Sequence, residues 1–103
     1  VIDTLAPVTG EVLIRKPASS SFTGTGLDYL LRNVGVEHVV LAGQFGDACV
    51  LYTLIQSREY GFKNYWLEDS VLYQTKLLKN MMPPLIGSRW AKLTNTRQLD
   101  KHL

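Results

Sequence analysis

Short apolar segments alternate along this chain with segments of helical periodicity, and this alternation limits the folds that it can adopt. Strand-like runs are expected at 12–14, 38–42, 64–68 and 90–94, with helical patterns between them. Strands and helices that alternate in this way form a parallel sheet with right-handed crossovers. The expected class is therefore α/β, with three layers (α-β-α) of the Rossmann-like type. Three or four strands make a thin sheet, so we expect an incomplete domain that lacks its N-terminal strands.

The first helix and the strand after it have clear local signals. Leucines and a valine at i, i+3, i+4 and i+7 predict a helix over 27–34, with Thr25 as its cap and Gly35 at its left-handed end. The small, polar stretch 18–26 before it is expected to be a loop. Residues 38–42 are almost wholly apolar, which is typical of a strand buried on both faces of a parallel sheet.

Two further helices are expected after that strand. Asp47 is a good N-cap for a helix over 48–60 that Gly61 ends. Asp69 and Ser70 occupy the same kind of position before a third helix. A terminal helix is expected over 95–103, capped by its first or second residue. The third helix is expected to carry Val71, Leu72, Leu78 and Met81 and to be broken by Pro83, Pro84 and Gly87.

The composition excludes several kinds of protein. The 11 Lys and Arg residues are scattered and give a net charge of only +2, so no nucleic-acid partner is expected. One cysteine cannot form an intrachain disulfide or a multi-cysteine zinc site, and His38 and His102 lack ligand-like spacing. No apolar run approaches the roughly 20 residues that span a membrane, and no signal-peptide pattern opens the chain. We therefore expect a cytoplasmic protein with no membrane anchor, metal or cofactor.

Polar residues follow three of the expected strands. Lys16 follows the first strand, the turn 43–49 follows the second, and Asp69 follows the third. Ligands of open α/β sheets bind outside the carboxyl ends of the strands, which lie about 4.8 Å apart. These groups are therefore expected to face one cleft that binds a small molecule, with Asp69 and Phe22, from the loop 18–26, at its rim.

Cys49 is the sharpest candidate for chemistry. It falls in the first turn of a helix that follows a strand and a tight turn, which is the position of a nucleophile on a strand-turn-helix elbow. The unpaired N–H groups and the partial positive charge of a helix N-terminus favour a thiolate and can hold an oxyanion. A single cysteine is also commonly a buried core residue, so the position leaves both interpretations open.

Three segments together carry a family resemblance. They are 5–16, which leads into Lys16; 21–31, with Ser-Phe-Thr-Gly-Thr-Gly-Leu at its start; and 38–53, in which Asp47, Cys49 and Val50 follow an apolar strand. This combination resembles the isochorismatase-like cysteine hydrolases, which include nicotinamidases and related amidohydrolases. The resemblance covers most of the chain. It implies that residues 1–103 are the C-terminal part of one such domain.

The resemblance also implies roles for individual residues. Cys49 would be the nucleophile and Lys16 its electrostatic partner. A non-proline cis peptide would join Gln44 to Phe45, and the backbone N–H groups of Phe45 and Cys49 would form an oxyanion hole. This chain departs from the family's pattern in two respects. The family's triad aspartate and its metal ligands would lie upstream of this chain, and Gly46 replaces the usual threonine.

The implied function is hydrolysis of a small amide or related substrate by thiolate attack, in a protein that assembles with copies of itself. An alternative is an inactive family member that acts as an interaction or scaffold protein, for which the apolar third helix offers a surface. A third hypothesis is a redox-sensing thiol protein. The reactivity of Cys49 toward iodoacetamide across pH separates these alternatives.

Overall fold

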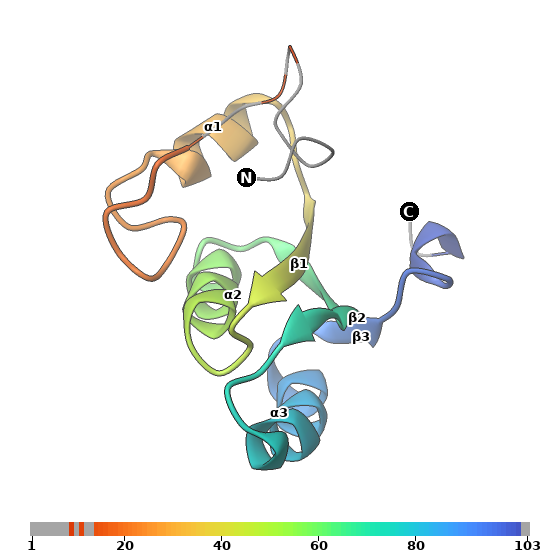
Figure 1. Ribbon diagram of the computed structural model, residues 1–103. Coiled ribbons are helices and arrows are strands. Elements are labelled where there is room, and N and C mark those ends of the chain that lie inside the picture. The colour runs from red at the N-terminus through yellow and green to blue at the C-terminus, as the bar shows by residue number, and fades with distance from the viewer. Residues whose placement is uncertain (1–8, 10, 12–13, 102–103) are drawn as a thin grey trace.

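The computed structural model describes residues 9, 11 and 14–101, and these residues contain a parallel sheet (Figure 1). Its strands are β1 (His38–Gln44), β2 (Lys63–Leu72) and β3 (Lys92–Thr94). They lie in the order β1-β2-β3, and both neighbouring pairs are parallel. The α/β class and the parallel sheet predicted from the sequence are confirmed.

Helices connect the strands as the alternation predicts. They are α1 (Leu27–Asn33), α2 (Cys49–Glu59) between β1 and β2, and α3 (Lys76–Arg89) between β2 and β3. A short 3-10 helix, Leu99–Lys101, follows β3 where a helix over 95–103 was expected. Among the described residues, none of these helices is both long and apolar enough to cross a bilayer.

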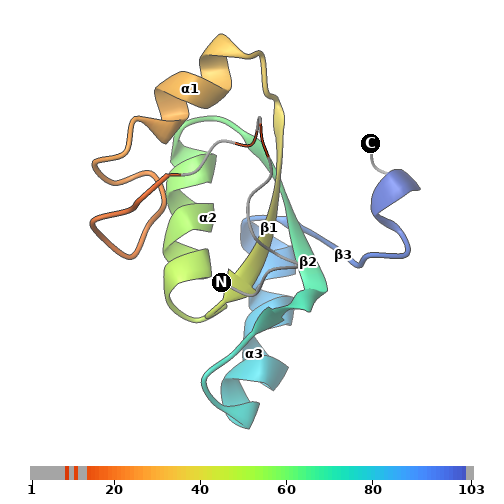
Figure 2. The same ribbon diagram turned by 45° about the horizontal axis from the view of Figure 1, so that its top comes forward.

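The core lies between one face of the sheet and the helices α2 and α3 (Figure 2). Leu41 of β1 and Trp66 of β2 are register partners and therefore share a face of the sheet. Both α2 and α3 contribute side chains to the same cluster on that face. Burial of these apolar groups is the main force that holds the layers together. The buried members of the cluster are Leu41, Val50, Leu54, Trp66, Val71 and Ile86.

The prediction that residues 38–42 are buried on both faces is wrong. Leu41 is buried, whereas Val40 is 37% exposed and Ala42 is also exposed. Side chains along a strand point to the two faces of the sheet in turn, so Val40 and Ala42 lie on the face opposite Leu41. The described helices cover only the face that carries Leu41.

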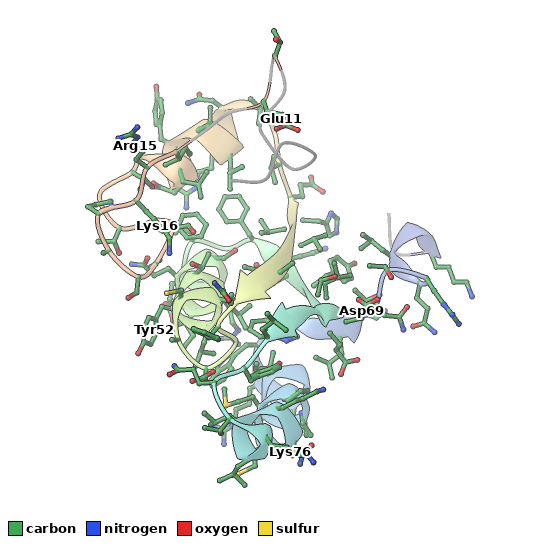
Figure 3. All side chains as sticks on the ribbon, viewed as in Figure 1. Glu11, Arg15, Lys16, Tyr52, Asp69 and Lys76 are labelled. Carbon is green, nitrogen blue, oxygen red and sulfur yellow. The ribbon has the colours of Figure 1, made fainter. Side chains whose placement is uncertain are left out.

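The strand expected at 12–14 lies mostly outside the described residues, which include only Ile14 of the three. Residues 14–16 are described and do not belong to a strand. Lys16 therefore lies on a loop that passes beside α2, and not at the end of a strand (Figure 3).

β2 continues four residues beyond the predicted strand, and this moves the start of α3. The register passes from Leu41–Trp66 to Gly43–Val71, so β2 carries an irregularity between these pairs. The expected cap, Asp69 and Ser70, lies inside β2, and Val71 is buried in the core. The N-cap of α3 is Thr75, whose hydroxyl accepts a hydrogen bond from the N–H of Leu78 at 3.2 Å.

The prediction that Pro83, Pro84 and Gly87 break the third helix is wrong. All three residues lie inside α3, which continues to Arg89. A proline inside a helix costs about 3 kcal/mol. Ile86 follows the two prolines and is fully buried, which anchors the last turn against the sheet. Gly87 allows close packing there, since a Cβ at this position would lie 2.9 Å from the Leu93 side chain. Tertiary packing therefore overrides the local signals.

Candidate functional site

The turn that joins β1 to α2, residues 45–48, is the centre of the candidate site; we call it the β1–α2 turn. The peptide bond between Gln44 and Phe45 is cis, at the position that the family resemblance indicates. The Phe45 carbonyl accepts hydrogen bonds from the N–H groups of Ala48 at 3.0 Å and Val50 at 3.1 Å. This compact turn makes Cys49 the first residue of α2.

The N-terminus of α2 has no side-chain cap. Ala48 occupies the N-cap position, so the prediction that Asp47 caps this helix is wrong. Among the described residues, the N–H groups of Phe45 and Cys49 have no hydrogen-bond partner. Such donors at the positive end of a helix can bind a negatively charged oxygen.

A hollow of about 350 Å³ lies beside this turn. The Cys49 side chain is half-buried and lines it, together with Lys16 from the preceding loop and Gln44 from the end of β1. Its walls are mostly apolar, as is usual for small-molecule sites. The other lining residues are Ser21, Phe22, Leu27, Leu31, Val39, Val40, Leu41, Ala42, Gly43, Val50 and Thr53.

Lys16 and Cys49 thus line one hollow, although 33 positions separate them in the sequence. The Lys16 side chain is exposed, and its Nζ donates a hydrogen bond to the carbonyl of Ser19 at 2.9 Å. In Figure 3, Lys16 lies on the loop beside α2, and its neighbour Arg15 points away from that helix. The hollow therefore has one cationic group at its wall.

Hydrogen bonds fasten the Lys16 loop to α2. The Thr53 hydroxyl accepts from the N–H of Ser21 at 3.0 Å and donates to the Cys49 carbonyl at 2.9 Å. The hydroxyls of Ser20 and Thr23 both donate to the Gln56 side-chain oxygen. These contacts couple the loop to the helix that begins at Cys49. Apart from Thr53 in the resemblance, no sequence pattern indicated the bonds between the loop and the helix, since those partners lie more than 30 positions apart.

Phe22 lines the hollow, and it also anchors the loop. It is 3% exposed, and its ring lies 5.3 Å from the ring of Tyr60 and 6.3 Å from that of Phe62, centre to centre. Pairs of aromatic rings at such distances stabilise a fold beyond their burial alone. The residue that the sequence placed at the rim of a cleft is thus a buried wall of the hollow.

Asp69, the other expected rim residue, lies elsewhere (Figure 3). It does not line the hollow beside Cys49, because the irregularity in β2 places it next to the segment that follows β3. Its carboxylate accepts from the Thr96 hydroxyl at 2.5 Å and from the Thr96 N–H at 3.2 Å. The bond from the Thr96 hydroxyl lowers the pKa of Asp69 below its ordinary value.

Asp47 and Gly46 have roles that the sequence did not reveal. The Asp47 carboxylate accepts two hydrogen bonds from Gln74, one from its backbone and one from its side chain. A Cβ at Gly46 would lie 2.7 Å from Val71 Cγ1 and 2.8 Å from Tyr73 Cζ. The space that a threonine would need is therefore filled, which accounts for the glycine.

Tyr73 borders the same turn from the segment that follows β2. Its hydroxyl accepts a hydrogen bond from Trp66 Nε1 at 3.0 Å, and partial burial raises the pKa of Tyr73. The sequence missed Tyr73 and Gln74 because the third helix was expected to occupy this segment. Within the described part of the chain, no group of three or more His, Cys, Asp and Glu side chains is arranged to hold a metal ion.

Comparison with known proteins places this geometry in context. A model of the isochorismatase domain matches residues 1–82. The ureidoacrylate amidohydrolase RutB of Yersinia enterocolitica is 34% identical over 70 residues, which cover 68% of this chain and 30% of that protein. The chain therefore spans about a third of the length of this curated relative.

Solved structures give the same result over nearly the whole chain. An isochorismatase-like hydrolase from Alkaliphilus metalliredigens has a TM-score of 0.89 at 26% identity, covering 97% of this chain and 55% of that one. An N-carbamoylsarcosine amidase from Thermoplasma acidophilum has a TM-score of 0.82 at 29% identity, covering 92% of this chain and 54% of that one. The chain corresponds to about half of each of these structures.

Proposed function

Because this chain belongs to the isochorismatase domain family, we propose that residues 1–103 form the C-terminal part of a hydrolase that cleaves a small amide or related substrate through Cys49. One observation carries the proposal. Cys49 begins a helix that has no side-chain cap, and it lines a hollow that also has the Lys16 ammonium group at its wall. Nucleophile, cation and free N–H donors are the parts that acyl transfer through a thiolate needs.

In the proposed reaction, the Cys49 sulfur forms a bond to the substrate's carbonyl carbon, and the electron pair of the C=O bond moves onto oxygen. Collapse of this oxyanion breaks the C–N bond, and the amine leaves with the proton that the thiol gave up. Water then attacks the resulting thioester, which releases the acid and regenerates the thiol. The N–H groups of Phe45 and Cys49 are the proposed donors to the oxyanion, because both are without partners among the described residues and belong to the turn and the helix start that carry the sulfur.

Lys16 has a supporting role in this proposal. A neighbouring ammonium group favours a thiolate over a thiol. Lys16 lines the hollow with Cys49, and the loop that carries it is fastened to α2 through Thr53 and Gln56. The base that moves the proton from sulfur to the leaving amine is proposed to be an aspartate upstream of residues 1–103, as the family resemblance implies.

The nature of the substrate follows from the hollow and from the relatives. About 350 Å³ with mostly apolar walls fits a small molecule with one polar reacting group. Two of the relatives are named for the compounds that they cleave, ureidoacrylate amidohydrolase and N-carbamoylsarcosine amidase, and these names point to ureido and carbamoyl compounds. We propose a substrate of this class, with a C–N bond to a carbonyl carbon.

The test is hydrolysis by the full-length protein and by its Cys49→Ala variant, measured as ammonia release from a panel of small amides and ureido compounds. We expect the variant to lose all measurable hydrolysis while its thermal unfolding midpoint stays close to that of the parent, because the side chain is only half-buried. Full hydrolysis by Cys49→Ala would refute the assignment of the nucleophile.

A second candidate function is supported by the outer face of α3. Leu77, Met81 and Leu85 are 66%, 58% and 39% exposed and, spaced four residues apart, form an apolar row on one side of the helix. Such a row favours an inactive scaffold subunit that assembles with copies of itself. This alternative predicts a Cys49 thiol that iodoacetamide does not alkylate near neutral pH, and an assembly that Met81→Lys dissociates in analytical ultracentrifugation.

A further inference from the structure

We propose that Asp47 and Gln74 form a positioning pair that fixes the β1–α2 turn, and with it the Cys49 thiol and the N–H groups of Phe45 and Cys49. The inference rests on the proposed function, since it concerns the same site. It assigns a purpose to an acidic residue that the sequence marked as a helix cap and that does not cap the helix.

The pair is held at two points. Asp47 Oδ1 accepts from the backbone N–H of Gln74 at 3.2 Å, and Asp47 Oδ2 accepts from Gln74 Nε2 at 2.8 Å. Two bonds from one residue to both carboxylate oxygens restrict rotation of the carboxylate, and bonds to a charged acceptor are stronger than neutral ones. Asp47 is thereby fixed to the segment between β2 and α3, 27 positions away in the sequence.

The neighbouring residue fastens the turn to the same segment. The N–H of Gly46 donates to the Leu72 carbonyl at 2.7 Å, and the side chains of Val71 and Tyr73 fill the space beside Gly46. Gly46 and Asp47 of the β1–α2 turn are thus held by the end of β2 and by the residues that follow it. Among the described hydrogen bonds of this attachment, Asp47 is the one residue of the turn that takes part through its side chain.

The consequence lies on the other side of the turn. Phe45 and Cys49 lie on either side of this attachment, and their N–H groups are among those left without partners in the described part of the site. Stabilisation of an oxyanion depends on donors that are already in place, and a displacement of about 1 Å can cost on the order of 100-fold in rate. Asp47 does not line the hollow, so its effect on the reaction passes through the turn.

The experiment compares two matched substitutions in the full-length protein. Gln74→Met removes the side-chain donor to Asp47, and Thr96→Val removes the side-chain donor to Asp69. Both leave a backbone N–H bond to the carboxylate, change no charge and alter an exposed residue. The two variants are therefore expected to fold and to lose similar stability.

We expect Gln74→Met to lower kcat for amide hydrolysis about 10-fold or more with KM unchanged, and Thr96→Val to leave both constants near the parent values. We also expect Gln74→Met, and not Thr96→Val, to change the alkylation rate of Cys49 by iodoacetamide at pH 7 about threefold or more, because Cys49 directly follows the turn.

The proposal is overturned if Gln74→Met matches the parent in both measurements, or if Thr96→Val reduces kcat as strongly, which would indicate a general loss of stability. Alkylation needs no substrate, so it still decides the matter if Cys49→Ala hydrolyses as well as the parent and the proposed function fails. In that case a change in alkylation rate specific to Gln74→Met supports the positioning pair, and the absence of that change overturns it.

Discussion

The two longest helices of the molecule begin in different ways. α3 starts at a conventional cap, where the Thr75 hydroxyl accepts a hydrogen bond from the N–H of Leu78. α2 has Ala48 at its N-cap position, which provides no side-chain cap, and Cys49 is its first residue. The cis peptide between Gln44 and Phe45 precedes this helix start. A helix N-terminus satisfied by its own side chain contributes to stability, whereas one left open can bind a ligand. The contrast agrees with the proposal that the start of α2 binds a ligand, whereas the start of α3 contributes to stability.

The largest effect that tests this contrast is expected at Lys16. Lys16→Met removes the cationic group from the wall of the hollow, and we expect hydrolysis by the full-length protein to fall about 100-fold, since the ammonium no longer stabilises the negative charge that develops in the proposed reaction. Arg15→Met is the matched control, because Arg15 is the adjacent cation and points away from α2 (Figure 3). Equal losses in both variants would show that only the overall charge matters.

The second effect concerns the glycine that lets the turn approach β2. Gly46→Ala is expected to lower the free energy of unfolding by about 1–3 kcal/mol, because the new Cβ overlaps Val71 and Tyr73. Gly87→Ala is the comparison, because its Cβ would meet a single side chain, Leu93, at 2.9 Å, and the position lies in a helix, where the higher propensity of alanine offsets part of that cost. Urea denaturation measures both. A smaller loss for Gly46→Ala than for Gly87→Ala contradicts the close approach.

The third effect concerns the cap of α3. In contrast to Lys16→Met, a substitution there is expected to change the free energy of unfolding and to leave the rate of hydrolysis unchanged. Thr75→Ala removes the cap of α3 and is expected to lower the free energy of unfolding by about 1 kcal/mol. The rate per folded molecule should stay the same, as Thr75 does not line the hollow beside Cys49. A fall in kcat at temperatures well below the unfolding transition would break the distinction between the two helix starts.

The smallest effect is the pH dependence of the Asp69–Thr96 contact. The pKa of Asp69 is lowered in the folded protein, mainly by the Thr96 hydroxyl, so the unfolded chain binds a proton more readily. The contact therefore adds stability above the ordinary pKa of 3.8, and this contribution disappears as the pH falls through the lowered value. We expect the melting temperature of Asp69→Ala to lie below that of the parent at pH 7 and to approach it below pH 3. A constant difference would contradict this linkage.

Sequence patterns predicted the elements that depend on neighbouring residues. The leucine spacing located α1, the apolar run at 38–42 located β1, and the left-handed glycines Gly35 and Gly61 lie at the ends of their helices as expected. The family resemblance indicated the cis peptide before Phe45. Each of these features depends on residues a few positions apart, so a single sequence can carry it.

The sequence failed where distant residues decide the outcome. Asp69 and Ser70 look like a helix cap, but pairing of Val71 with Gly43 draws them into β2. Pro83 looks like a helix end, yet the burial of Ile86 keeps α3 continuous.

The partner of Asp47 shows the same limit within the site. Asp47 occurs at a position typical of an N-cap, and nothing nearby points to Gln74, 27 residues later. No pattern within ten residues could reveal such a pair, because it exists only when the segment after β2 lies against the β1–α2 turn.

The most direct test of the account is mass spectrometry of the full-length protein quenched during turnover of a small amide or ureido substrate. If Cys49 is the nucleophile, the peptide that contains it carries an acyl group, at a level that falls when the substrate is exhausted. No such adduct is expected in Cys49→Ala. Steady hydrolysis with the Cys49 peptide unmodified at every time point, and equal turnover by the variant, would contradict this role of Cys49.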